Sequence, residues 1–317
     1  MSAPSVAITI PVYKPTMTDL EEMSLERCVE VLGRFPIVFF GPESLDYELY
    51  LGLVAQSTVV RFPDRYFRSL ETYSELLLSA AFYKAFSIFE FMLIYQLDAF
   101  VFRDDLEYWC SRDFDYVGAP WWDEKMGWTG VGNGGFCLRK PARCLAVLTS
   151  RHKEDPEAFW AHVRRFNRNP VIQAMQYPRK IARELGVAGT VDQFLARFIR
   201  RGCAEDHFWG YAAVRYWPEF RLASVEDALR FSVEGGLQQA AARYKEWPPF
   251  GCHRDRYVRM VRRFLESAEP PAALEEALVW NLAELAGMKR TVGCVSLAEN
   301  ANNNAHNGEA TTDRPAN

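Results

Sequence analysis

The stretch Phe91-Met92-Leu93-Ile94-Tyr95-Gln96-Leu97-Asp98-Ala99-Phe100-Val101-Phe102 is the densest apolar run in the chain. It is too short, and with Gln96 and Asp98 too polar, to span a bilayer. The run instead predicts a central strand that is buried on both faces of a sheet. The carboxylate near its end needs an explanation, because burying an unpaired charge is costly.

Asp98 has two interpretations at this point. As a structural residue it caps a turn or pairs with an arginine such as Arg103. As a functional residue it lies at the carboxyl edge of the sheet, where α/β proteins bind their ligands. A carboxylate there can hold Mg²⁺ or Mn²⁺ against a diphosphate, because these hard cations prefer oxygen ligands and share them with phosphates.

Strand and helix signals alternate through the first hundred residues. The expected strands are 6–13, 37–40 and 58–62, and the expected helices run from about Thr18 to Gly33 and from Glu71 to Ser87. This alternation predicts an α/β fold with a mostly parallel, Rossmann-type central sheet flanked by helices. Residues 256–267 and 272–285 predict C-terminal helices, since their apolar residues recur at helical spacing.

The domain organisation follows from the same pattern. Residues 1–265 are expected to form one domain, 266–298 a helical extension and 299–317 a disordered tail. The tail is polar and low in complexity, so it cannot bury enough apolar surface to fold. With 317 residues and 49% hydrophobic content, the remainder can fill a large core.

Charge and cysteine content exclude several classes of protein. A net charge of −4 with dispersed arginines gives no basic surface for nucleic acid. The N-terminus lacks a cationic stretch followed by an apolar core, so a cytoplasmic location is expected. The seven cysteines are scattered and form no Cys-x-x-Cys pair, which indicates neither a disulfide framework nor a zinc cluster.

The segment from Gly130 to Gly135 formally matches Gly-x-Gly-x-x-Gly, the motif of dinucleotide-binding sites. That motif needs a strand before it and a helix after it. Here a polar, tryptophan-rich loop comes before the segment, and residues 136–139 alternate like a short strand. The dinucleotide interpretation is therefore disfavoured.

The same glycine-rich segment can bring backbone close to a ligand. Asn133, with Gly134 and Gly135, would then bind hydroxyl groups of a ligand, here a substrate that accepts a transferred group. A tight turn or bulge explains the glycines equally well. Trp121 and Trp122 nearby offer flat faces to a sugar ring, whereas tryptophans are more often simply part of a core.

Two further signals come late in the chain. Glu205 and Asp206 are adjacent acids before an aromatic stretch, and such acids favour the N-terminus of a helix. One of them can instead act as a general base on an acceptor hydroxyl. His253 follows a Pro/Gly turn, where a histidine is usually a surface residue, but it can also complete a mixed carboxylate and imidazole cation site.

Three segments resemble a known group of proteins. Tyr-Gln-Leu-Asp-Ala-Phe at 95–100, Gly-Asn-Gly-Gly-Phe at 132–136 and Phe-Gly-Cys-His at 250–253 are similar to segments of a family of uncharacterised glycosyltransferase-like proteins. The order of these motifs, after an Ile-Pro-Val-Tyr first strand, also resembles GT-A glycosyltransferases over residues 5–265. The resemblance implies a GT-A-like fold and transfer of a sugar from a nucleotide-sugar donor.

The resemblance also implies roles for individual residues. Against β-1,3-galactosyltransferase-like enzymes, Asp98 matches a metal-binding acid of an Asp-x-Asp pattern, and Gln96 replaces the other acid. This departure leaves a metal-independent mechanism open. The same comparison makes Asp206, next to Glu205, the catalytic base, and it makes His253 the second metal ligand.

The working hypothesis is an inverting glycosyltransferase that depends on Mn²⁺ or Mg²⁺. Pro11, Val12 and Tyr13 would line the nucleotide pocket together with Gln96 and Asp98. The acceptor would be a glycan or glycolipid, as in polysaccharide biosynthesis. Retention of configuration, contact with a membrane surface and a homodimer stay open.

Two other classes of protein remain as alternatives. One is a non-catalytic protein that binds a nucleotide or a sugar. The other is a different Rossmann-like, nucleotide-dependent enzyme, such as one that uses a nicotinamide cofactor. Fold alone cannot separate these classes, because one fold supports many functions.

Overall fold

The computed structural model describes residues 5–150, 190–192, 195, 204–243, 249–266, 276, 278–280, 283 and 288. The strands are β1 Val6–Pro11, β2 Ile37–Pro42, β3 Thr58–Phe62, β4 Phe91–Tyr95, β5 Ala99–Val101, β6 Tyr116–Gly118, β7 Pro120–Asp123, β8 Gly127–Val131, β9 Phe136–Arg139, β10 Ser232–Val233 and β11 Gly251–His253. The helices are α1 Asp19–Leu32, α2 Glu48–Leu53, η1 Asp64–Phe67, α3 Leu70–Leu77, α4 Ala80–Ala85, α5 Leu106–Ser111, α6 Pro141–Thr149, α11 Glu205–His207, η3 Phe208–Ala212, α12 Ala213–Tyr216, α13 Val225–Phe231, α14 Leu237–Arg243 and α15 Asp255–Glu266.

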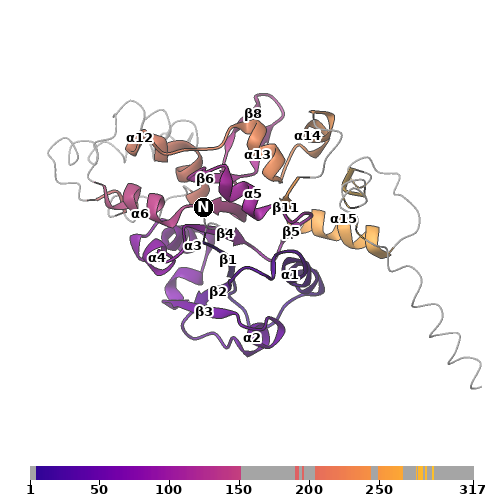
Figure 1. The fold of residues 1–317 in the computed structure, drawn as a ribbon, viewed down its shortest axis with the longest axis horizontal. Helices are drawn as coiled ribbons and strands as arrows, with labels where there is room; N and C mark the ends of the chain where they lie inside the picture. Colours follow the sequence, from indigo (N-terminus) through magenta and orange to yellow (C-terminus); the bar gives the residue numbers. More distant parts are fainter. Residues whose placement is uncertain are drawn as a thin grey trace, which may run out of the picture.

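The main sheet has six strands in the order β3-β2-β1-β4-β9-β6. The first four run parallel, and β9 is antiparallel to both of its neighbours. In Figure 1, α1 lies on one side of these strands, and α3, α4 and α6 lie on the other. The predicted α/β fold, a mostly parallel central sheet flanked by helices, is therefore confirmed.

Strand β4 shows why the apolar run at its centre has no polar alternation. Phe91, Leu93 and Tyr95 belong to a core cluster with α1, α5 and α13 on one face of the sheet. Met92 and Ile94 belong to a second cluster with α3, α4 and α6 on the opposite face. Burying one such side chain contributes about 1.5–3 kcal/mol, so a strand covered on both faces favours apolar residues at every position.

Helix α1 forms as its sequence predicts. The Thr18 side chain accepts the backbone N–H of Glu21, while the Glu21 carboxylate accepts the N–H of Thr18. This reciprocal capping satisfies two donors that the first turn would otherwise leave unpaired. Leu25 and Leu32 point into the core, and the backbone N–H of Gly33 closes the last turn on Val29.

The single helix predicted from Glu71 to Ser87 is wrong, because two shorter helices, α3 and α4, occupy this region. Three consecutive leucines end α3, and Leu76, Leu77 and Leu78 are all buried. Three successive residues cannot lie on one helical face, so the chain breaks and turns. Ser79 begins the next helix, since its hydroxyl accepts the N–H of Phe82.

The single strand predicted from Phe91 to Phe102 is also wrong, because it is two strands in different sheets. Strand β4 ends at Tyr95, and the Ala99 N–H donates to the Gln96 carbonyl to form a turn. Strand β5 then pairs antiparallel with β11, with Ala99 opposite His253, and β10 completes this small sheet. The turn consequently places Asp98 beside the end of β11.

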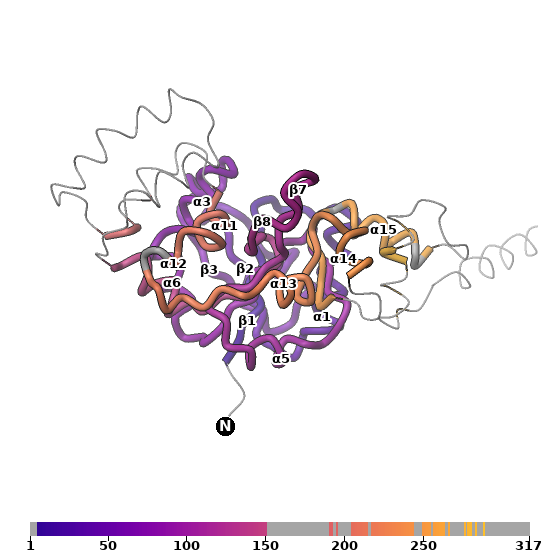
Figure 2. The backbone as a smooth tube through the Cα atoms, turned by 90° about the horizontal axis from the view of Figure 1, so that it is seen from above, coloured from indigo at the N-terminus to yellow at the C-terminus, as the bar shows by residue number. Residues whose placement is uncertain are grey.

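The β7–β8 hairpin forms a third, two-stranded sheet, and in Figure 2 it stands out from the body of the molecule. Helix α15 provides the predicted C-terminal helix at 256–267. The tail at 299–317 and most of the extension at 266–298 lie outside the described residues, so the domain boundaries stay predictions. No helix within the described ranges is long and apolar enough to cross a membrane.

Candidate functional site

A pocket of about 760 Å³ lies at the carboxyl ends of β1 and β4. The two strands are parallel neighbours, so their ends meet at one edge of the sheet. The residues of the pocket wall that are expected to bind the donor are Pro11, Val12, Tyr13, Gln96 and Asp98. The wall also includes three basic side chains that the sequence did not single out, Lys14, Arg68 and Arg259, and the Glu21 carboxylate, which pairs with Lys14 at 2.8 Å. The structure therefore brings the expected donor-binding residues together and adds positive charge beside them.

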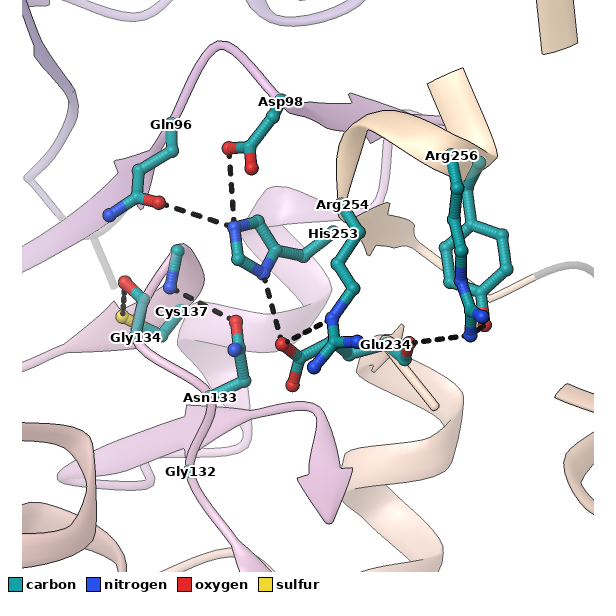
Figure 3. Close-up of polar contacts among 12 residues, drawn as sticks. Gln96, Asp98, Gly132, Asn133, Gly134, Cys137, Glu234, His253, Arg254 and Arg256 are labelled. Carbon is teal, nitrogen blue, oxygen red and sulfur yellow. Dashed lines mark hydrogen bonds and ion pairs between the residues drawn. The ribbon is translucent and has the colours of Figure 1, made fainter. Parts of the chain in front are cut away.

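His253 joins the pocket residues from the neighbouring strand, β11. Its Nε2 lies 3.2 Å from Asp98 Oδ1 and 3.2 Å from Gln96 Oε1, as Figure 3 shows. The alternative partner Arg103 instead pairs with Asp105, at 2.9 Å. His253 is buried rather than on the surface.

The carboxylates of Asp98 and Glu234 favour the protonated form of His253, and the His253 imidazolium favours the ionised form of these carboxylates. Burial lowers the pKa of His253, but the hydrogen bond that Asp98 accepts and the negative charges of Asp98 and Glu234 outweigh it and raise the pKa to about 9. Burial raises the pKa of Asp98, but His253 and then Arg254 outweigh it, so the net pKa lies below the usual value. At neutral pH the site thus holds an imidazolium between two carboxylates.

Glu234 is the functional candidate that the sequence analysis missed. It is buried, and its Oε1 lies 3.6 Å from His253 Nδ1 and 3.0 Å from the Nε of Arg254. One signal could have found it: the carboxylate follows the short strand β10 and comes directly before Gly235 and Gly236. Like Asp98, it is an acid that closely follows the end of a short strand, the position where ligands collect in α/β sheets.

The donors around His253 Nε2 can be compared with the needs of a divalent cation. Two neighbouring ligands of an octahedral ion, each at about 2.1 Å, lie about 3 Å apart. The Nε2–Oδ1 and Nε2–Oε1 distances, both 3.2 Å, fit that requirement. Among the described residues, however, no group of three or more His, Cys, Asp or Glu side chains is placed to hold a metal ion.

This donor set fits a cation that takes its other ligands from substrate and water. Mg²⁺ and related ions commonly bind one or two protein carboxylates and complete their shell with phosphate oxygens. Asp98 and His253 would supply the protein ligands, with the Gln96 amide oxygen beside them. A cation held in this way needs the diphosphate, which the pocket next to Asp98 has room to contain.

The glycine-rich segment lies between this site and the pair of acids. A side chain at Gly135 would overlap the His253 imidazole, and one at Gly134 would overlap the Glu205 carboxylate and touch Asp206. The glycines are therefore required because side chains of two distant segments fill the space on either side of them. The segment also places His253 and Asp206 next to consecutive residues of one loop.

Asn133 takes part in the structure of this loop. It is buried, and its side-chain oxygen accepts the N–H of Gly135 at 3.0 Å. The segment connects β8 to β9, so a strand rather than a helix follows it. Its surroundings therefore differ from those of a dinucleotide-binding motif, as the sequence indicated.

The adjacent acids Glu205 and Asp206 occupy different environments. Glu205 Oε1 accepts from the guanidinium of Arg139 at 2.9 Å, and Arg139 has no exposed surface and also donates to the Tyr83 hydroxyl. Asp206 is partly exposed and accepts the backbone N–H of His207 at 2.7 Å. Both lie in the first turn of α11, as the helix-terminus interpretation predicts, but Glu205 is buried against Arg139 whereas Asp206 is partly exposed.

The environment of Asp206 suits a general base near neutral pH. Burial, followed by the charges of Glu205 and Glu234, raises the pKa of Asp206 to about 7. A base is most effective when its pKa lies close to the working pH, because it must be deprotonated and still attract a proton. A carboxyl whose pKa is strongly perturbed is a typical mark of a functional site.

The buried pair of Glu205 and Arg139 is expected to be structural. Glu205→Leu would leave the Arg139 guanidinium buried and uncompensated, which costs about 3–5 kcal/mol of unfolding free energy. The matched control is Glu226→Leu, because Glu226 pairs with Arg243 at the surface and such pairs contribute about 1 kcal/mol or less. Urea denaturation measures both variants, and equal losses would contradict a structural role for Glu205.

The two tryptophans expected at the acceptor side lie on β7. Trp121 stacks on Tyr211 with ring centroids 4.9 Å apart, and its ring lies 4.9 Å from that of His207. Trp122 packs edge-on against Trp128. Trp121 therefore lies beside the residue that follows Asp206, whereas neither tryptophan lines the pocket that contains Asp98.

Comparison with known protein families gives one match. Residues 56–253 match a family model described as "Protein of unknown function (DUF5672)". The matched range includes all three motif segments from which the resemblance was inferred. None of the curated proteins matches the chain.

Three solved structures show a distant likeness to the chain. Mouse xyloside xylosyltransferase 1 in its apo form has a TM-score of 0.43 and 12% identity, covering 78% of this chain and 96% of its own. The galactosyltransferase LgtC, in complex with donor and acceptor sugar analogues, has a TM-score of 0.42 and 11% identity, covering 92% of this chain and 99% of its own. The mannosyltransferase PcManGT from Pyrobaculum calidifontis, in complex with GDP-Man and Mn²⁺, has a TM-score of 0.29 and 13% identity, covering 76% of each chain.

Proposed function

The chain belongs to the family described as "Protein of unknown function (DUF5672)", and we propose that it is a glycosyltransferase that uses a nucleotide-sugar donor and a divalent cation. The observation that carries this proposal is the geometry at the sheet edge. A carboxylate, an imidazole and an amide oxygen converge beside a pocket with basic walls, and a partly exposed carboxyl lies across two glycines from them.

The pocket is proposed to hold the donor. Pro11, Val12 and Tyr13 would line the nucleotide site, while the Arg68 guanidinium would bring positive charge for a diphosphate. Asp98 and His253 would hold Mn²⁺ or Mg²⁺. When bound, the cation would neutralise the negative charge that develops on the departing diphosphate.

Asp206 is proposed to activate the acceptor. Its carboxylate would take the proton from an acceptor hydroxyl as that oxygen forms a bond to the anomeric carbon of the donor sugar. The bond from the anomeric carbon to the diphosphate breaks, and the nucleoside diphosphate leaves with the bonding electrons. Direct displacement of this kind inverts the configuration at the anomeric carbon.

The acceptor is proposed to approach from the β7 side. Trp121 presents an aromatic ring close to His207, and sugars pack well against such rings because their C–H faces are apolar. A glycan or glycolipid would provide the ring and the hydroxyl. Asn133, Gly134 and Gly135 would then form the floor between the donor and the acceptor, through backbone rather than through the Asn133 oxygen.

Release of nucleoside diphosphate tests this function. Purified protein is incubated with UDP-, GDP-, CDP- and dTDP-sugars in Mn²⁺ or in EDTA, and slow hydrolysis is measured with water as the acceptor. We expect one donor to release its nucleoside diphosphate in Mn²⁺ only. Binding of a nucleotide sugar without release would favour a non-catalytic binding protein. A rise of the melting temperature with NAD, but with none of these nucleotides, would favour a nicotinamide-dependent enzyme.

The pH profile of the reaction is a separate prediction. Because Asp206 has a pKa of about 7 and must be deprotonated to act as a base, kcat/KM is expected to rise with pH and to level off above about pH 7. Initial rates between pH 5 and pH 9 measure the profile. A flat profile across this range would contradict the assignment of Asp206 as the base.

A further inference from the structure

We propose that Glu234 is a positioning residue for the cation site: it fixes the proton of His253 on Nδ1, so that Nε2 is the nitrogen that faces the cation. This inference rests on the proposed function, because it concerns the same site. It adds a residue from a segment that neither the sequence motifs nor the expected donor-binding set includes.

The geometry assigns opposite partners to the two nitrogens of one ring. In Figure 3, His253 lies between Asp98 and Gln96 on one side and Glu234 on the other. Nε2 is 3.2 Å from Asp98 Oδ1, and Nδ1 is 3.6 Å from Glu234 Oε1. Nδ1 is buried without a hydrogen-bond partner at this distance, so the Glu234 carboxylate is the acceptor that a small movement would bring within reach.

This arrangement decides which nitrogen binds a cation. A cation that binds one nitrogen displaces the proton there, so the imidazolium keeps a single proton on its other nitrogen. Next to the Glu234 carboxylate the proton is more stable on Nδ1, which leaves the Nε2 lone pair directed toward Asp98. Histidines that bind metals generally donate their second N–H to a carboxylate or carbonyl, which orients the ring and makes it a better ligand.

Glu234 is itself held in place by its neighbours. Arg254 Nε donates to Glu234 Oε1 at 3.0 Å, and the Arg256 guanidinium donates to the Glu234 carbonyl at 3.4 Å. The backbone N–H of Arg254 also donates to the Asp98 carbonyl at 2.9 Å. The residue after His253 thus ties both carboxylate-bearing segments to the histidine strand.

The backbone at Arg254 supports a functional reason for this geometry. Its φ is +103°, a conformation that L-residues other than glycine rarely adopt. Such strain persists only where the surrounding structure imposes it, and it is concentrated at functional sites. Here it directs the Arg254 side chain to Glu234 while its backbone stays bonded to the Asp98 turn.

Binding of Mn²⁺ measures the effect of Glu234 without any assay of activity. The affinity for Mn²⁺ is determined by electron paramagnetic resonance in the presence of saturating UDP or GDP, for wild type, Glu234→Gln and Glu234→Ala. We expect Glu234→Ala to weaken Mn²⁺ binding about 10- to 100-fold. Glu234→Gln is expected to lose less Mn²⁺ affinity than Glu234→Ala, because the glutamine amide oxygen can still accept a hydrogen bond from His253 Nδ1.

Two matched variants separate positioning from general structure. Glu226→Gln removes an exposed carboxylate that pairs with Arg243, and it is expected to leave Mn²⁺ affinity unchanged. Arg254→Gln removes the arginine partner of Glu234 while leaving the carboxylate beside His253. If Glu234 served only to pair with Arg254, Arg254→Gln would weaken Mn²⁺ binding as much as Glu234→Ala does, and this result would overturn the inference.

A spectroscopic readout reports the ring directly. In protein labelled with ¹⁵N-histidine and loaded with Mg²⁺ and nucleoside diphosphate, His253 is expected to show a protonated Nδ1, and Glu234→Ala is expected to lose this pattern. Unchanged Mn²⁺ affinity and an unchanged ¹⁵N pattern in both Glu234 variants would overturn this inference alone. A wild type that binds no Mn²⁺ with either nucleotide would overturn the inference together with the proposed cation site.

Discussion

Replacing Asp206 with asparagine is expected to lower turnover by about 10²- to 10⁴-fold, the usual contribution of a positioned general base. The asparagine side chain has nearly the same shape but cannot take a proton. Its oxygen can still accept the backbone N–H of His207, so the local structure is expected to persist. Nucleotide affinity should stay unchanged, because Asp206 does not line the donor pocket.

The same variant is expected to be more stable than the wild type at neutral and higher pH. The unfolded chain ionises Asp206 near its ordinary value, about 3.9, whereas the folded protein keeps the proton up to about 7. The folded state therefore binds an additional proton between these values, and the wild type loses stability as the pH rises from about 4 to about 7. Asparagine has no proton to lose, so the gain in Tm should grow over this range.

Asp46→Asn is the control for both effects of Asp206→Asn. Asp46 is exposed and accepts only the nearby N–H of Glu48, a bond that asparagine can retain. Turnover and Tm of this variant should match those of the wild type. If Asp206→Asn kept normal turnover, Asp206 could not be the base.

Asp98→Ala is expected to abolish the part of nucleotide affinity that depends on metal. In the wild type, EDTA should weaken nucleoside diphosphate binding, whereas in the variant Mn²⁺ and EDTA should give the same affinity. The loss should be at least about 100-fold, since changing only a residue behind a metal ligand already costs 10- to 100-fold. Isothermal titration of the nucleotide, with and without Mn²⁺, measures both values.

The control for this variant is Asp104→Ala, from the same region of the chain. Asp104 forms an exposed ion pair with Arg34 and does not line the pocket. It is expected to bind nucleotide as the wild type does, because exposed pairs contribute little to stability. If Asp98→Ala retained the full response to Mn²⁺, the cation would have to bind elsewhere.

Much of the sheet could be predicted because its central strands are recognisable from their apolar character alone. Strand β4 is apolar throughout, and β1 is apolar except for Thr9, whose hydroxyl donates to the Leu93 carbonyl, so both short runs predict strands buried on two faces. The donor-binding residues follow from the same reasoning. Parallel neighbours end at one edge, so Pro11 and Gln96 had to lie close together once both strands were predicted.

The breaks within apolar stretches could not be predicted from their composition. The turn from Gln96 to Asp98 interrupts an apolar run that continues in β5, and α3 ends within three leucines. Each break depends on which part of the hydrophobic core the next residues pack against, and only the folded chain defines that part. Local propensity is overridden in both places by tertiary packing.

The roles of the two adjacent acids could not be separated by sequence either. Glu205 and Asp206 are equivalent in the sequence, and the difference between them is the buried Arg139, which comes from a distant strand. Glu234 was missed for the same reason, because its relation to His253 depends on the pairing of β10 with β11. Side chains that meet across such pairings leave only weak signals in the order of residues.

The location of bound Mn²⁺ tests most sharply whether Asp98 and His253 form a cation site for the nucleotide-sugar donor. Crystals of the protein with Mn²⁺ and the nucleoside diphosphate that binds it can be measured for anomalous scattering from manganese. We expect a single manganese peak between Asp98 and His253, in contact with the diphosphate inside the pocket. A nucleotide bound in the pocket with manganese elsewhere, or no nucleotide in the pocket, would contradict it.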